Sequence, residues 1–151
     1  MKTDLFSYYV EANNFYLKYA KGEPFVKQEE FHDYHEFVLF INGHSRLLSK
    51  DIQQDLTCGS IVLIPKEHFH QFIVAHPEEY ERCILGFKEM NETKELIESV
   101  MTSIKVANAP NERISYLFDR LKEVVCGDLD ESEKKLFIQA ALVQLDRKSV
   151  V

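Results

Sequence analysis

Two short segments constrain what this chain can fold into more than any other feature. They span residues 30–43 and 59–70. In the first, His32 and Glu36 are four residues apart in a strand-like stretch, and the two-residue period of a strand sends both side chains to one face. The second segment adds His70 just beyond a turn. Three titratable side chains that face one interior can hold a metal or bind a small polar ligand.

Short apolar runs separated by turns predict an all-β barrel or sandwich in the first part of the chain. Asn42-Gly43 is a tight-turn signal, and Pro65 and Pro77 stop further runs. Residues 1–30 are rich in aromatic side chains, which favours short strands or an arm lying across a barrel. The other expected strands cover residues 36–41, 45–48, 52–56, 60–64, 71–74 and 82–87.

After Phe87 the apolar spacing becomes helical. Residues 90–101, 112–126 and 130–145 each carry an apolar stripe with helix periodicity. Gly127 is placed to end the second of these helices, and Asp130 to open the third. We therefore expect residues 1–88 to form a β-barrel with an N-terminal arm, and residues 89–151 a helical extension that is part of the same domain.

Composition excludes several classes of protein. A chain of 151 residues with 45% hydrophobic and 28% charged residues is typical of one globular domain. Its formal net charge of −7 opposes direct binding of nucleic acid, which needs a basic face. No apolar run approaches the roughly twenty residues that span a bilayer. The N-terminus has no signal-peptide core, and the 3 cysteines form no Cys-x-x-Cys pair, so reduced thiols in the cytoplasm are expected.

The two segments resemble the signature stretches of a cupin barrel, and the chain is similar to the N-terminal regulatory domain of AraC-family transcription regulators over about residues 25–145. The residues that carry the resemblance are His32, Glu36 and Gly43, then Gly59, Pro65 and His70. The sequence departs from the metal-binding cupin pattern at Glu30, where a histidine is common, and at Glu67, where a turn glycine is common. The resemblance implies a double-stranded β-helix, or jelly-roll barrel, followed by α-helices.

Three hypotheses for the polar residues stay open on the sequence alone. The first is a ligand pocket in which polar groups converge between aromatic walls. Its residues are His32, Tyr34, Glu36, Phe40, His70 and Phe72. The second is a divalent metal held by Glu30, His32, Glu36 and His70. The third is a polar patch in which His32 and Glu36 only pair with each other.

The remaining histidines and cysteines give no catalytic set. His35 and His68 have the opposite strand parity from His32 and His70, so we expect them at the surface or in packing roles. No Ser/His/Asp or Cys/His arrangement is visible, and Cys58 at a turn is expected to be structural. The hypothesis that this protein is an enzyme therefore depends wholly on a bound metal.

The resemblance also implies a homodimer. In AraC-type regulators the helices after the barrel commonly form the dimer interface, which here corresponds to residues 112–126. The apolar stripe of this segment consists of Ile114, Leu117, Phe118, Leu121 and Val125. The alternative is that the stripe packs on the barrel of its own chain, and the sequence does not separate the two.

The predicted function is that of an effector-sensing regulatory domain, with a small-molecule effector, no cofactor and no enzymatic activity. DNA would be bound through helix-turn-helix units that normally follow such a domain and that would lie beyond this sequence. We expect no contact of this domain with nucleic acid or membrane. The alternative is a stand-alone metal-dependent cupin enzyme of the dioxygenase or isomerase type.

Overall fold

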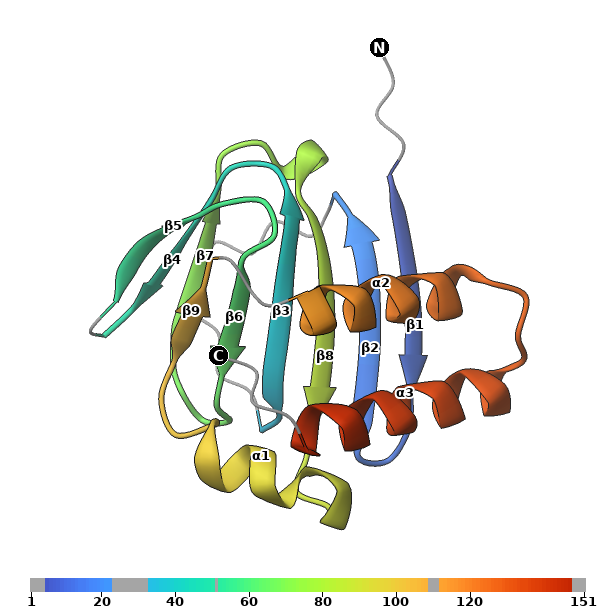
Figure 1. The fold of residues 1–151 in the computed structure, drawn as a ribbon. Coiled ribbons are helices and arrows are strands. Elements are labelled where there is room, and N and C mark those ends of the chain that lie inside the picture. Colours follow the sequence, from blue (N-terminus) through green and yellow to red (C-terminus); the bar gives the residue numbers. More distant parts are fainter. Residues whose placement is uncertain (1–4, 23–32, 51, 109–111, 148–151) are drawn as a thin grey trace.

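The strands form two antiparallel sheets in a computed structural model that describes residues 5–22, 33–50, 52–108 and 112–147 (Figure 1). The larger sheet has six strands in the order β1-β2-β8-β3-β6-β9, and the smaller has three in the order β5-β4-β7. The strands are β1 (Phe6–Glu11), β2 (Phe15–Lys21), β3 (His35–Asn42), β4 (Ser45–Ser49), β5 (Gln53–Leu56), β6 (Ile61–Ile64), β7 (His70–Val74), β8 (Glu81–Phe87) and β9 (Lys105–Ala107).

Helices α2 and α3 lie across one face of the six-stranded sheet, over β8, β2 and β1 (Figure 1). The helical elements are the 3-10 turns η1 (Pro77–Glu79) and η2 (Asn91–Thr93) and the helices α1 (Lys94–Ser99), α2 (Glu112–Cys126) and α3 (Glu131–Arg147). Asp130 opens α3 with a capping box: its carboxylate accepts from the Glu133 amide at 2.9 Å, and the Glu133 carboxylate accepts from the Asp130 amide. Among the described residues, no helix is both long and apolar enough to cross a membrane.

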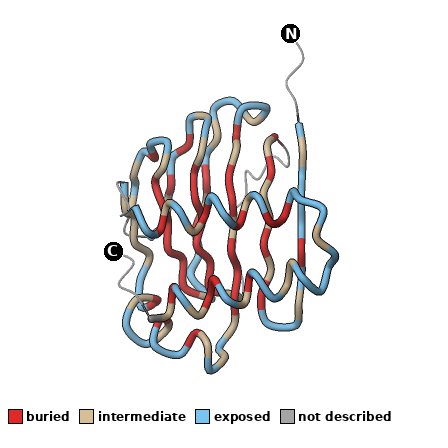
Figure 2. Tube along the Cα trace, turned by 45° about the vertical axis from the view of Figure 1, so that its right-hand side comes forward, coloured by how far each residue is buried: buried red, intermediate tan, exposed pale blue. Residues whose placement is uncertain are grey.

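Strand alternation divides the larger sheet between two cores. On β3, Phe37 and Leu39 face the helices, while Val38 and Phe40 face the smaller sheet. The second core fills the space between the sheets and includes Phe72 of β7. In Figure 2 the buried residues follow the strands, whereas each helix alternates between buried and exposed positions. The central strands of the six-stranded sheet are therefore covered on both faces, whereas most of the edge strand β1 is exposed.

The barrel with C-terminal helices confirms the predicted fold class, with local differences in the helical extension. The aromatic N-terminal stretch forms the strands β1 and β2, which is one of the two alternatives that its composition favours. The helix expected over residues 90–101 is divided into η2 and α1. The strand β9, which pairs with β6, was not predicted: it lies in the helical extension expected over residues 89–151, between the first two expected helices, and three residues are too few to show a strand period. Glu67 adopts φ 60°, the left-handed conformation for which the cupin pattern uses glycine.

The apolar stripe of α2 packs against the strands of its own chain. Ile114, Phe118, Leu121 and Val125 are each at most 2% exposed within the core beneath the helices. Leu117 packs at the edge of that core and is half-buried. Packing within the chain therefore accounts for this stripe, and its role in a dimer stays a prediction.

Candidate ligand site

Glu36 is the centre of the candidate site. It lies on β3 with only 5% of its surface exposed, between Gly86 of β8 and Ile64 of β6 in the register of the sheet. Strand alternation places it on the same face as Val38 and Phe40, which line the core between the sheets. Its side chain therefore faces the barrel interior. A buried carboxylate is costly unless it is hydrogen-bonded, so its partners show what the site can do.

Tyr16 of β2 supplies a partner from two strands away. Its hydroxyl donates a hydrogen bond to Oε2 of Glu36. The strand register places Tyr16 beside Gly86, and Gly86 beside Glu36. A Cβ atom at Gly86 would lie within 2.7 Å of three carbons of the Tyr16 ring, closer than carbon atoms approach each other in proteins. The missing side chain of Gly86 thus leaves the space through which Tyr16 crosses β8.

Three tyrosine rings gather beside this hydrogen bond. The Tyr9 and Tyr16 centroids are 5.9 Å apart in a stacked arrangement, and those of Tyr16 and Tyr34 are 5.3 Å apart in a T-shaped one. Nζ of Lys88 lies 4.7 Å from the centroid of the Tyr34 ring, a cation–π contact. Tyr34 also borders an open hollow lined by Glu11, Ala12, Asn13, Tyr34 and Lys135. The predicted ligand residue Tyr34 therefore stands between this hollow and Tyr16.

His70 and Phe72 approach from the smaller sheet. They are 2% and 7% exposed, and their rings meet at 5.8 Å in a T-shaped contact. Strand β6 ends at Ile64, opposite Glu36, and β7 begins at His70 after a five-residue connection. This connection returns the chain at the same end of the barrel. Glu36 and His70 therefore belong to the same end of the interior, on opposite sheets.

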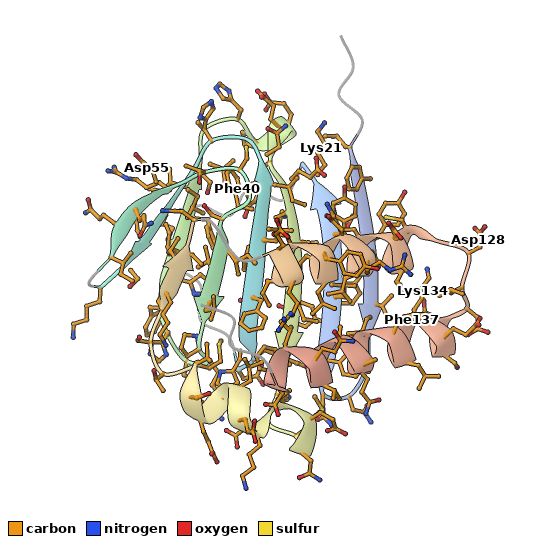
Figure 3. The ribbon with its side chains drawn as sticks, in the orientation of Figure 1. Lys21, Phe40, Asp55, Asp128, Lys134 and Phe137 are labelled. Carbon is orange, nitrogen blue, oxygen red and sulfur yellow. The ribbon has the colours of Figure 1, made fainter. Side chains whose placement is uncertain are left out.

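The other end of the barrel is closed by packing. Phe40, labelled in Figure 3, is 1% exposed, and its ring centroid lies 6.2 Å from that of Tyr80. The buried guanidinium of Arg82 lies 4.5 Å from the Tyr80 ring centroid. Its Nη1 donates to the carbonyl oxygens of Gly22 and Tyr80. Phe40, which the sequence predicts as a pocket wall, thus packs at the end away from Glu36.

Only two of the four predicted metal ligands, Glu36 and His70, belong to the described residues. Glu30 and His32 lie outside the described residues, which also applies to His32 as a predicted ligand residue. Glu36 and His70 are on opposite sheets, and protein metal sites commonly use three or four protein ligands. Two described donors do not form such a set by themselves, so the metal hypothesis stays a prediction that depends on Glu30 and His32.

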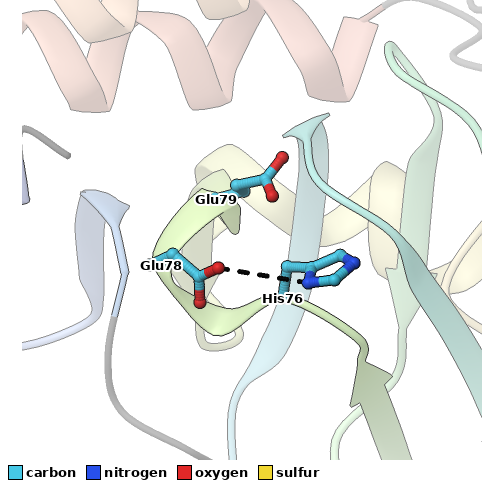
Figure 4. A group of neighbouring side chains, drawn as sticks. All are labelled: His76, Glu78 and Glu79. Carbon is cyan, nitrogen blue, oxygen red and sulfur yellow. Dashed lines mark ion pairs between the residues drawn. The ribbon is translucent and has the colours of Figure 1, made fainter. Parts of the chain in front are cut away.

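One group of three metal-capable side chains does lie together within the described ranges, at the turn before β8 (Figure 4). His76, Glu78 and Glu79 each offer a ligand atom, and these atoms lie within 4.8 Å of one another. Nδ1 of His76 is 4.0 Å from a carboxylate oxygen of Glu78. All three side chains are exposed, and none belongs to the predicted set. This group is therefore a surface feature separate from the barrel interior.

His35 faces the helix side of β3, as its parity predicts. It is 3% exposed and packs 5.6 Å from the Phe87 ring. Its Nδ1 accepts a hydrogen bond from the Lys66 amide at 3.1 Å, so Nε2 carries the proton, and Nε2 has no hydrogen-bond partner among the described residues. Burial is the main cause that lowers the pKa of His35; Lys66 and His68 lower it further, and Glu89 opposes them.

Tyr16 and Gly86 are the site residues that the sequence analysis missed. Tyr16 lies in the aromatic N-terminal stretch, where its pairing with β8 depends on the tertiary register. Gly86 offered a readable signal, because an isolated glycine inside a strand often marks a close approach by another group. Its partner could not be named without the structure.

Two sheets closed around an apolar interior, with titratable groups at one end, define a barrel of the cupin type. The family model of the AraC-like ligand binding domain matches residues 13–145, and the chain belongs to this family. It is thus a regulatory ligand-binding domain of the kind found in AraC-type transcription regulators. No curated protein matches the chain.

One of the solved structures that the chain resembles supports the fold. Apo ToxT from Vibrio cholerae is 16% identical with a TM-score of 0.55, covering 89% of this chain and 55% of its own. A Cupin 2 conserved barrel protein from Salinispora arenicola is 17% identical with a TM-score of 0.46, covering 58% of this chain and 78% of its own. A protein of unknown function from Streptococcus pyogenes is 12% identical with a TM-score of 0.47, covering 60% and 79%.

Gly86→Ala should destabilise the domain by about 1–3 kcal/mol, because the added methyl group overlaps the Tyr16 ring. Urea unfolding measures this cost. In a Tyr16→Ala background the overlap is absent, so the same substitution should cost far less, and the double-mutant cycle should show the coupling. An equal cost in both backgrounds would show that Tyr16 does not cross β8.

Stability should fall as the pH drops below about 6.5, the ordinary pKa of histidine, because His35 takes up a proton more readily in the unfolded chain than in the folded one. The contribution of neutral His35 to the free energy of unfolding is complete above about pH 6.5. It is lost as the pH falls from there through the lowered pKa of His35 in the folded protein. Urea unfolding between about pH 7 and pH 5 measures the slope. His35→Asn keeps an acceptor for the Lys66 amide and should flatten the profile, while the control His44→Asn, at an exposed position that is not among the causes of the His35 shift, should not. An unchanged slope in His35→Asn would contradict the assignment.

Proposed function

We propose that the interior of this barrel binds a small polar effector at the end marked by Glu36 and His70. The observation that carries the proposal is the buried carboxylate of Glu36, which faces the interior of a domain from a ligand-binding family. A pocket with a few polar groups between apolar walls is the common form of a small-molecule site. Tyr34 and Phe72 are the aromatic neighbours of these two polar groups, and His32 joins the set through the family resemblance.

The proposed signal leaves the barrel through its helices. Both α2 and α3 contact β1, and α2 also contacts β2, the strand that carries Tyr16. An effector that binds one arrangement of sheet and helices more tightly shifts the population toward it. In a full-length cytoplasmic regulator, that shift would alter the spacing or orientation of the helix-turn-helix units that bind DNA. This sensor role, which needs no catalytic group, is preferred to an enzyme on the basis of family membership.

Glu36→Gln should weaken effector binding about ten- to a hundred-fold, the loss of one hydrogen bond to a charged group. Compounds that stabilise the unsubstituted domain in a thermal-shift screen are titrated against both proteins. The glutamine oxygen still accepts from Tyr16, so the substitution should leave the fold intact. The exposed Glu89→Gln serves as the control. Unchanged affinity in Glu36→Gln would place the effector elsewhere.

A second part of the proposal is a homodimer formed through the α2–α3 face. A groove of about 230 Å³ lies between these helices. Its lining includes Leu117 and Leu121 from the predicted interface, together with Tyr116 and Phe137, which are 66% and 48% exposed. Phe137 projects from α3 in Figure 3. Large apolar side chains that border an apolar groove suit a second copy of the same helix pair.

Tyr116→Glu combined with Phe137→Glu should convert the dimer to a monomer, because both charges would have to be buried in the interface. Sedimentation equilibrium measures the change. Ile73→Glu, at a 46% exposed position on β7, is the matched control and should leave the dimer intact. A dimer that persists in the double variant would exclude this face.

A further inference from the structure

A single row of residues across three neighbouring strands links Glu36 to the edge of the sheet. Tyr16 on β2, Gly86 on β8 and Glu36 on β3 are consecutive partners in the strand register. The row continues from Tyr16 to Glu11 at the end of β1. The inference below rests on the proposed function, since it concerns what happens at Glu36 when an effector binds.

The Tyr16 hydroxyl is hydrogen-bonded to a carboxylate oxygen of Glu36 that a bound ligand would also use. Glu36 accepts the hydrogen bond in its contact with Tyr16, so a group that takes the place of the phenol at Oε2 must also donate one. The phenol of Tyr16 donates to Oε2 of Glu36. It is itself a hydroxyl group held next to the barrel interior by an aromatic ring, which resembles part of a small polar ligand.

We propose that Tyr16 occupies the effector position at Glu36 in the free protein and that the effector displaces it. The effector must then carry a hydrogen-bond donor, such as a hydroxyl, ammonium or amide group, at the point where it meets Glu36. An acceptor-only group, such as a carboxylate, cannot take the place of the phenol. Tyr16 is thus an intramolecular competitor for the ligand site.

The space left by the missing side chain of Gly86, which we call the slot, is the structural basis for the exchange of Tyr16 with the effector. The Tyr16 ring crosses β8 only because position 86 carries no side chain. The ring is half-buried, and its neighbour Tyr34 borders the open hollow beside Lys135, so the ring lies close to space outside the barrel. A ring that leaves the slot opens the approach to Glu36.

Displacement of Tyr16 would also affect the helices, through the strand β1 that they contact. The Tyr16 ring stacks with Tyr9 on β1, and Tyr9 is 51% exposed. A change in the Tyr16 rotamer therefore changes the packing along β1, and β1 contacts both α2 and α3. The same movement that admits the effector acts on the strand beneath the helices, which supplies the two-state element that a population shift requires.

The substitution Tyr16→Phe distinguishes two roles of Tyr16, competition with the effector and support of Glu36, because the two roles predict opposite changes in effector affinity. If Tyr16 only supported Glu36 or contacted the effector directly, Tyr16→Phe would weaken binding. If Tyr16 competes with the effector, Tyr16→Phe removes the competitor and should tighten binding by about ten-fold, the equilibrium effect of one hydrogen bond to a charged group. Tyr9→Phe is the matched control, because it alters the neighbouring ring without touching the hydrogen bond to Glu36.

The experiment uses 19F NMR on protein that carries 3-fluorotyrosine at its 7 tyrosines. Tyr16→Phe assigns the Tyr16 line by its loss. Ethanolamine and glycerol are the donor-bearing probes, and acetate is the acceptor-only control. The donor-bearing probes should shift the Tyr16 line and acetate should not. Binding of ethanolamine to Tyr16→Phe, followed on the Tyr34 line, should be about ten-fold tighter.

The inference is overturned if no donor-bearing probe shifts the Tyr16 line, if acetate shifts it equally, or if Tyr16→Phe binds ethanolamine no more tightly. If Tyr16→Phe folds poorly, single Tyr→Phe substitutions at the other six tyrosines assign the Tyr16 line by elimination, and the shift of that line in the unsubstituted protein decides the question. Binding that is lost in Glu36→Gln while the Tyr16 line stays in place would keep the proposed site and reject the exchange. Binding unaffected by Glu36→Gln would reject both.

Discussion

Burial of the central strands β8, β3 and β6 on both faces of the sheet is the constraint on which the rest of this structure depends. One face is covered by α2 and α3, and the other encloses the barrel interior against the smaller sheet. The central strand β3 is therefore apolar on both sides: Phe37 and Leu39 belong to one core, and Val38 and Phe40 belong to the other. A polar side chain in such a strand has no access to water, so it needs a partner supplied by the protein or by a ligand.

Glu36 shows how this requirement becomes a binding site. The phenol of Tyr16 supplies the hydrogen-bond partner of Glu36 from within the chain. This contact requires glycine at position 86, because a side chain there would overlap the Tyr16 ring. Satisfied buried polar groups are specific, because a group of the wrong shape or hydrogen-bonding type leaves them unpaired. His70 adds a second polar group at the same end, while Phe40 and the buried Arg82 close the other. The interior is thus polar at one end and packed at the other.

Sequence reasoning recovered what depends on local periodicity and missed what depends on register between distant strands. Alternation along β3 correctly placed Val38 and Phe40 on one face with Glu36, and Gly127 correctly marked the end of α2. Tyr16 could not be found in this way, because its neighbour two strands away is fixed by pairing through β8. The short strand β9 was missed because its three residues carry no period. Tertiary pairing is the information that one-dimensional patterns lack.

The position of β9 has a consequence for how the chain is made. Residues 105–107 pair with β6, so the edge of the larger sheet is completed only after α1 has been synthesised. The apolar face behind β8 and β2 is covered later still, when α2 and α3 arrive. A nascent chain that has emerged only as far as β8 therefore presents an open strand edge and a bare apolar sheet face to the cell. Exposed apolar surface and an unpaired strand edge of this kind favour aggregation of a partly synthesised domain until α3 has emerged.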